Sequence, residues 1–304
     1  MKLLATVHSW ASLSRAGNSV SGVFGVLLGS ILASRGMPGG DFAIITLLHS
    51  ISVMTFMFSW NALNDYVDIE IDRTNRPDRP LPSGAITLES AMRGIQIFGL
   101  FSIISLALAG YIASSMNSGL SDWAPSLAIW ALALILLFNY ESNSRFSYKM
   151  KDKGLPGNIA ISLSVGLVII FGAASVSKPL DARAWSVFLI GFLYNFSREI
   201  VKDIEDIEGD KGRNTFAMSS GVDRARALAA GLLVLALVTI LAPFLPFFQI
   251  FTDWHVIFVI PAVVSLIMVK PRLFASEDNA AQKLIKKSMQ LCLIAFLAIS
   301  LIPS

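Results

Sequence analysis

The sequence predicts an all-α polytopic membrane protein, built as a single bundle of nine transmembrane helices. Of its 304 residues, 54% are hydrophobic and only 15% are charged, a composition typical of chains that cross a membrane several times. Apolar runs of about 20 residues, long enough to span a bilayer, recur nine times. The Lys and Arg residues concentrate in alternate loops, as expected for a chain that threads back and forth through a bilayer.

No polar segment between the nine runs is long enough to form a separate soluble domain, so we expect one transmembrane domain over residues 1–304. The first 16 residues show no small-residue cleavage pattern, which argues against a removable signal peptide. The eighth run is short and contains Pro261, which predicts a kink. The runs cover residues 18–34, 43–62, 92–113, 124–144, 157–176, 184–201, 227–248, 255–270 and 284–302.

The loop charges predict the orientation. With the N-terminus in the cytoplasm, only Arg35, Lys178 and Arg183 among the 24 Lys and Arg residues fall on the outer side. This asymmetry predicts a multi-pass protein of the cell membrane with the N-terminus inside and the C-terminus outside. The single cysteine, Cys292, lies in the last apolar run and excludes both a disulfide framework and a cysteine-based metal site.

Acidic residues directly follow the second apolar run. Charged side chains at that place are energetically unfavourable unless a cation or another partner binds them. On a helix with about 100° per residue, Asp65, Asp68 and Asp72 fall within roughly 60° of one another. Asn61 lies inside the same arc, and Glu70 points to the far side. Because like charges this close need cations, the pattern predicts a metal site at the cytoplasmic membrane surface.

The acidic motif is repeated after the sixth run. NDYVDIEIDR (64–73) aligns without gaps with KDIEDIEGDK (202–211), at an offset of 138 residues. The chain is therefore expected to consist of two related halves, with their motifs at 61–84 and 198–215, as in many membrane proteins with internal repeats. The plainer alternative is that both motifs are solvated helix ends.

Oxygen-only ligand sets of this kind suit Mg²⁺, which often meets substrate phosphates. Two such motifs facing each other are expected to hold Mg²⁺ and a diphosphate between them. The residues expected to bind metal are Asn61, Asp65, Asp68, Asp72, Asp203, Asp206 and Asp210, and the six aspartates are also the expected catalytic residues.

Basic residues accompany both motifs and are expected to form a phosphate clamp. Each base taken alone is as well explained as a positive-inside charge. The segment NRPDRPLPSG (75–84) cannot stay helical and forms either a lid or a plain connector. The bases are Arg73, Arg76, Arg79, Lys149, Lys151, Lys153, Lys211 and Arg213.

With these residues in view, the whole chain resembles the UbiA-type intramembrane prenyltransferases. The resemblance rests on NDYVDIEID (64–72), on the loop at 75–84, on the acidic segment 203–210 and on a Tyr/Lys segment before the fifth apolar run. It implies that both motifs bind Mg²⁺ and diphosphate, that Lys151 contacts diphosphate, and that Arg15 and Asn18 match polar family positions. Some relatives lack an acid at the position of Asp210.

Within the family, residues 198–210 look most like the archaeal enzymes that attach a geranylgeranyl group to the hydroxyl of geranylgeranylglyceryl phosphate. The resemblance thus implies an isoprenyl diphosphate donor and a lipid acceptor in ether-lipid biosynthesis. Phe56, Phe58 and Trp60 are candidates to line a groove for the prenyl tail, although helix packing is the favoured role for any one of them. The expected substrate-binding residues are Arg15, Asn18, Asn61, Asn64, Arg73, Arg79, Arg145, Tyr148, Lys149, Lys151, Lys202 and Lys211.

Three other functions remain open on the sequence. An aromatic quinone precursor, such as 4-hydroxybenzoate or homogentisate, is the alternative acceptor. A cation or phosphate transporter is the alternative outside enzymes, although transporters place their sites near the midplane rather than at helix ends. A silent lipid-binding scaffold is disfavoured by the intact motifs. We expect membrane lipids and no nucleic acid as partners, and the oligomeric state stays open.

Overall fold

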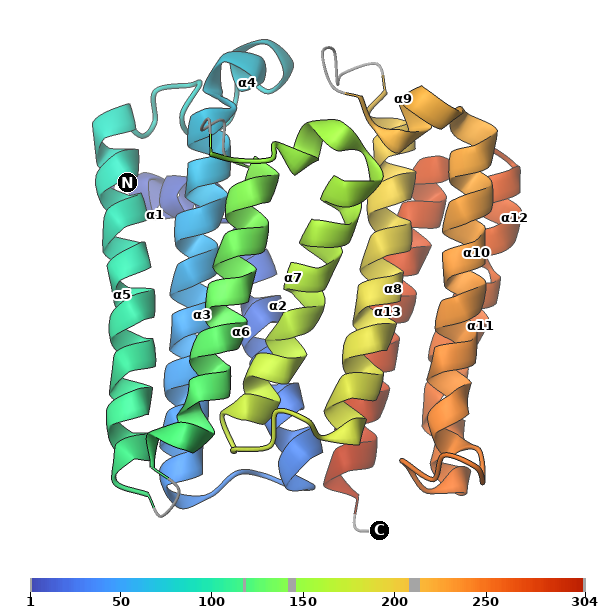
Figure 1. Cartoon of the computed structure of the whole chain (residues 1–304). Coiled ribbons are helices and arrows are strands. Elements are labelled where there is room, and N and C mark those ends of the chain that lie inside the picture. Colours follow the sequence, from blue (N-terminus) through green and yellow to red (C-terminus); the bar gives the residue numbers. More distant parts are fainter. Residues whose placement is uncertain (1, 117–118, 142–145, 208–213, 303–304) are drawn as a thin grey trace.

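The computed structural model describes residues 2–116, 119–141, 146–207 and 214–302. All regular elements in this part of the chain are helical, and the long helices stand side by side in one bundle (Figure 1). In chain order they are α1 (Lys2–Leu13), α2 (Ala16–Ser34), α3 (Gly40–Val67), α4 (Ile69–Asn75), α5 (Leu88–Ser114), α6 (Leu120–Glu141), η1 (Met150–Lys153), α7 (Leu155–Ala174), α8 (Ala182–Glu205), α9 (Phe216–Ser220), α10 (Val222–Leu241), η2 (Ala242–Phe244), η3 (Asp253–Val259), α11 (Ile260–Ile267), α12 (Val269–Phe274) and α13 (Asp278–Leu301).

Eight segments among the described residues are long and apolar enough to cross a membrane, so the chain is an all-helical polytopic membrane protein. The sequence predicted nine spans, and the difference is α8. Its 24 residues form a helix where one was expected, but Asn195, Arg198 and Glu199 make it more polar than the others. The eighth expected span is broken, as Pro261 suggested, into η3, α11 and α12.

Polar caps begin two of the long helices. The Thr87 side chain accepts a hydrogen bond from the Ser90 amide at the start of α5. The Asp181 carboxylate accepts from the Arg183 and Ala184 amides at the start of α8. These caps satisfy amides that have no partner inside a helix, and they fix where each helix leaves the preceding loop.

Glycines let α2 and α7 approach closely at the centre of the bundle. A Cβ added at Gly29 would collide with the Ile169 carbonyl oxygen, and one added at Gly172 would collide with the Val26 carbonyl oxygen. Small residues commonly hold membrane helices together in this way. The contact fixes α7 against the first part of the chain.

We therefore expect Gly172→Ala to lower the free energy of unfolding by about 1–3 kcal/mol, because the added methyl forces two backbones apart. Gly191→Ala in α8 is the matched control, since a Cβ there meets nothing within 4 Å. Thermal unfolding of both purified variants checks this. Equal melting temperatures would contradict the close α2–α7 packing.

A small apolar cluster anchors the chain that surrounds the first acidic motif. Leu13 of α1, Ala62 of α3 and Ile95 of α5 pack together with Leu81 of the proline-rich segment 75–84 and with Ile86, which follows it. Leu81 and Ile86 are only 5% exposed, so this segment is docked on the bundle. The segment is therefore packed against the bundle beside the first acidic motif.

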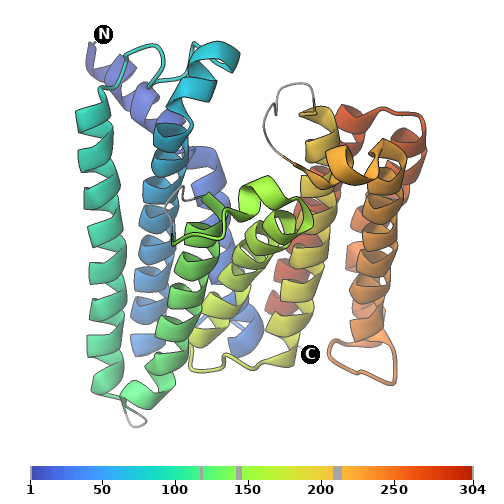
Figure 2. The same cartoon turned by 45° about the horizontal axis from the view of Figure 1, so that its top comes forward.

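The elements that carry the predicted motifs lie at one end of the bundle. Figure 1 shows α4, η1 and α9 at the same end, and Figure 2, in which this end comes forward, places η1 between α4 and the neighbouring end of α8. α1 lies toward this end, and α13 ends at the opposite end.

Candidate active site

The first acidic motif forms a buried ion-pair cluster with two arginines. Arg15 Nη2 donates to Asp65 Oδ1 at 2.7 Å and to Asn64 Oδ1 at 2.9 Å. Arg79 Nη1 donates to the same Asp65 oxygen at 3.1 Å and to Asp72 Oδ2. Asp65 and Asp72 are each only 4% exposed. We call these five residues the arginine cluster.

Local backbone structure brings both arginines to the cluster. Arg15 stands between α1 and α2 in the left-handed region, with φ of 48°, which turns the chain sharply at the edge of the motif. Arg79 lies in the proline-rich segment, which the buried Leu81 and Ile86 hold against α3 and α5. Each arginine shares one terminal nitrogen between two side chains of the motif, and such charge-assisted hydrogen bonds are among the stronger ones in proteins.

The third aspartate of the motif pairs with a different base. Asp68 stands at the junction of α3 and α4, and its Oδ2 accepts a hydrogen bond from Lys151 Nζ at 2.8 Å. The same Nζ donates to Glu141 Oε1 at 2.6 Å. Glu141 ends α6 and is 5% exposed. We call Asp68, Lys151 and Glu141 the lysine bridge, because it joins three separate elements.

The second acidic motif lies at the end of α8. Asp203 Oδ2 accepts a hydrogen bond from Asn158 Nδ2 at 2.9 Å, and Asp206 caps the helix in a half-buried position. Lys202 Nζ lies 3.8 Å from Glu199 Oε2. Asp210, Lys211 and Arg145 lie outside the described residues, so their predicted roles stay predictions.

The two motifs share a local geometry at matched positions of the sequence repeat. Asp68 has φ −84° and ψ 8°, and Asp206 has φ −89° and ψ 2°. The Asp68 amide donates to the Asn64 carbonyl at 3.0 Å, and the Asp206 amide donates to the Lys202 carbonyl at 3.0 Å. Each motif therefore ends a long helix with the same turn.

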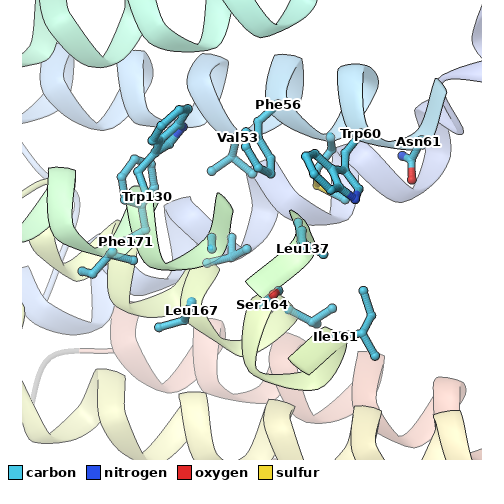
Figure 3. A pocket seen from close by; sticks show the side chains of 15 residues that line it. Val53, Phe56, Trp60, Asn61, Trp130, Leu137, Ile161, Ser164, Leu167 and Phe171 are labelled. Carbon is cyan, nitrogen blue, oxygen red and sulfur yellow. The ribbon is translucent and has the colours of Figure 1, made fainter. Parts of the chain in front are cut away.

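An apolar pocket leads from the first motif into the bundle. It has a volume of about 150 Å³ and lies between α3, α6 and α7. Asn61 lies at one end of the pocket, and Trp130 and Phe171 lie at the other (Figure 3). Asn61 Nδ2 donates to the Ser14 carbonyl at 3.0 Å. The polar end of the pocket therefore leads toward Asp65, one helical turn further along α3.

Two of the three aromatic residues expected to line a groove do so. Phe56 and Trp60 line the pocket with stacked rings 5.8 Å apart. Phe58 packs edge-on against Phe98 at 5.3 Å instead, as a helix contact.

The side chains of several predicted substrate-binding residues make no described contact with the buried carboxylates. Arg73 pairs with the exposed Glu70 on the outside of α4, at 2.8 Å. Asn18, Tyr148 and Lys149 are exposed. The Asn18 amide donates to the Arg15 carbonyl, the Tyr148 amide to Asn139 Oδ1 and the Lys149 amide to Ser147 Oγ. No described contact links the side chains of Asn18, Tyr148 and Lys149 to either motif.

Sequence reasoning missed two residues of the site, Glu141 and Asn158. Glu141 is an acid at the very end of an apolar run, a place where ionisable residues are rarely without a role. Asn158 is a buried amide in the first turn of α7, and its partner Asp203 is 45 residues away in the sequence. That separation leaves no local pattern from which to infer the contact.

The donor chemistry fits Mg²⁺, although the carboxylates are not gathered as a metal site. Among the described residues, no three Asp, Glu, His or Cys side chains are arranged to hold a metal ion. The reason is that Arg15, Arg79 and Lys151 stand between the acids. The acids themselves offer only oxygen atoms, the ligands that Mg²⁺ prefers.

Comparisons with known proteins agree on one family. The model of the UbiA prenyltransferase family matches residues 22–297. The digeranylgeranylglyceryl phosphate synthase of Methanopyrus kandleri is 31% identical over 96% of this chain and 99% of its own length. The enzyme of the same name from Methanothermobacter thermautotrophicus is 32% identical over 96% of each chain.

Solved structures share the fold. A structure described as digeranylgeranylglyceryl phosphate synthase superposes with a TM-score of 0.73 and 26% identity, covering 97% of this chain and 98% of that one. A UbiA homologue from Archaeoglobus fulgidus, solved with GPP and Mg²⁺, gives a TM-score of 0.61 at 15% identity, covering 96% of this chain and 99% of that one. At that identity the likeness concerns the fold alone.

Proposed function

Because the chain belongs to the UbiA prenyltransferase family, we propose that it transfers a geranylgeranyl group from geranylgeranyl diphosphate to the hydroxyl of geranylgeranylglyceryl phosphate. The reaction releases diphosphate and forms an ether lipid. Full-length relatives named digeranylgeranylglyceryl phosphate synthase support this acceptor over an aromatic quinone precursor. The aromatic acceptor remains the second candidate, and the assay below separates the two.

The observation that carries the proposal is a cluster of paired acids and bases at the end of an apolar pocket. The pocket offers aromatic and aliphatic walls to a prenyl tail. The arginine cluster and the lysine bridge offer acids for a metal ion and bases for a diphosphate at its polar end. An allylic diphosphate has this division, with a charged head and an apolar tail.

We infer that the bases exchange partners when the donor binds. Arg15 and Arg79 leave their carboxylate partners, Lys151 leaves Asp68, and all three donate to phosphate oxygens. Asn61, Asp65, Asp68 and Asp72 would then be the Mg²⁺ ligands of the first motif, and Asp203, Asp206 and Asp210 those of the second motif. When bound, Mg²⁺ supplies positive charge that stabilises the departing diphosphate.

Bond formation follows from the position of the two lipids. The bond between C1 of the prenyl chain and the diphosphate oxygen breaks, the acceptor hydroxyl oxygen bonds to C1, and its proton is released. Phe56 and Trp60 hold the tail in the pocket, which keeps water away from the allylic carbon. Holding both lipids in register supplies much of the rate by proximity.

The proposal also covers the orientation of the chain in the membrane and the number of its membrane spans. α1 lies toward one end of the bundle and α13 ends at the other, which fits an odd number of crossings and supports α8 as a ninth span beside the eight apolar ones. The Lys and Arg distribution supports a cytoplasmic active site. The matched turns at Asp68 and Asp206 support two related halves in one domain.

The acceptor is tested by offering labelled geranylgeranyl diphosphate and Mg²⁺ to the purified protein. Geranylgeranylglyceryl phosphate, 4-hydroxybenzoate and homogentisate are supplied in parallel. We expect transfer to the lipid phosphate alone. Transfer to an aromatic acceptor would contradict the lipid assignment, and transfer to none together with ion flux in vesicles would favour a transporter.

A further inference from the structure

The lysine bridge contains a residue to which neither the sequence motifs nor the comparisons give a role. Glu141 lies outside both acidic motifs, at the last position of α6. Its side chain is 3% exposed, and its contact with Lys151 is 2.6 Å. A carboxylate buried to this degree is costly unless it is paired. The ion pair with Lys151 explains how the buried charge of Glu141 is stabilised, but it does not explain why an acid stands at this position.

Its place relative to the pocket gives the reason. Leu137, one turn earlier on the same face of α6, lines the pocket, as does Asn61 on α3. The next turns of these two helices carry Glu141 and the first acidic motif. Lys151 therefore stands at the polar end of the pocket, held from one side by α6 and from the other by the α3–α4 junction.

We propose that Glu141 is the positioning residue for Lys151, and this assignment rests on the function proposed above. In the structure, Lys151 Nζ has two carboxylate partners, Asp68 and Glu141. When Asp68 becomes a metal ligand, Glu141 stays as the tether that keeps the ammonium at the pocket end. Lys151 is then free to donate its remaining N–H groups to the diphosphate without leaving the site.

The proposal predicts that removal of Glu141 weakens diphosphate binding, whereas simple electrostatics predicts that it strengthens binding. Neutralising a nearby acid raises the local positive potential, so a bystander Glu141 would on removal strengthen the binding of an anionic diphosphate. A positioning residue gives the reverse. Without Glu141, Lys151 has only Asp68 as its carboxylate partner, and once Asp68 binds metal no carboxylate holds the ammonium at the end of the pocket.

The test is calorimetric titration of inorganic diphosphate into the full-length purified protein at fixed Mg²⁺. We expect Glu141→Gln to weaken binding about tenfold, the size of one hydrogen bond to a charged group. In a Lys151→Met background the same change should no longer weaken binding, because residues that act through each other are not additive. Glu89→Gln, which removes an exposed ion pair with Arg93 on α5, is the matched control and should change nothing.

Thermal unfolding accompanies each titration. Glu141→Gln should stay folded because Lys151 keeps Asp68, and Glu141→Asp, which keeps the charge, should show intermediate affinity. Tighter or unchanged diphosphate binding by Glu141→Gln, or an equal loss in the Lys151→Met background, would overturn the assignment. If the wild-type protein binds no diphosphate, the proposed function fails first, and the assignment falls with it.

Discussion

Asp65→Asn is expected to reduce prenyl transfer on the order of 10³-fold while leaving the protein folded. Asp65 is almost fully buried and receives hydrogen bonds from both Arg15 and Arg79. The amide has the same shape but lacks the negative charge with which the carboxylate would attract Mg²⁺. Folding survives because Arg79 keeps Asp72 and Arg15 keeps Asn64. Steady-state transfer rates and thermal unfolding of the purified variant check both halves of this prediction.

The control is Glu70→Gln, only five residues further along. Glu70 is exposed and pairs with Arg73 on the far side of α4, where an ion pair contributes little. We expect less than about a threefold change in rate, in line with the small value of such pairs. A loss as large as that of Asp65→Asn would contradict the assignment of ligands by helix face.

Asp203→Asn is expected to cause a loss of similar size, on the order of 10²–10³-fold, because the second motif supplies the other half of the metal site. Its structural contact is preserved, since an Asn oxygen still accepts the hydrogen bond from Asn158. The measurement is again the transfer rate, together with retention of the folded protein in detergent.

Glu205→Gln tests whether the position or merely the charge matters. Glu205 ends α8 close to Asp203, but in the sequence repeat it aligns with Val67, which has no charge. We expect near-normal transfer from this variant. Near-normal transfer from Asp203→Asn would instead show that the second motif takes no part in the reaction.

The positions of the long helices were largely predictable, because the length and periodicity of apolar runs determine where a chain forms membrane helices. The family resemblance and the enzyme class were predictable from the motif residues at 64–84 and 203–210, and the comparisons confirm both. The number of membrane spans was less predictable. Asn195, Arg198 and Glu199 lower the hydropathy of α8. For a helix interrupted by polar residues, hydropathy alone does not distinguish a membrane span from a helix buried inside the bundle.

The contacts of the site were only partly predictable. The helix-face argument grouped Asp65 with Asp72, which share Arg79, but it also grouped Asp68, whose partner is Lys151. Which base meets which acid depends on the turn at Arg15 and on the docking of Leu81 and Ile86. These are tertiary effects, and spacing along one helix does not encode them.

The central claim is that acids and bases of the site are paired with each other until metal and diphosphate arrive together. Titration of the wild-type protein with Mg²⁺ alone, with inorganic diphosphate alone, and with each in the presence of the other tests it directly. Because coupling between two ligands is reciprocal, each should tighten the other by the same factor, and we expect about a hundredfold. Tight binding of Mg²⁺ without diphosphate, or diphosphate binding that survives EDTA, would contradict the account.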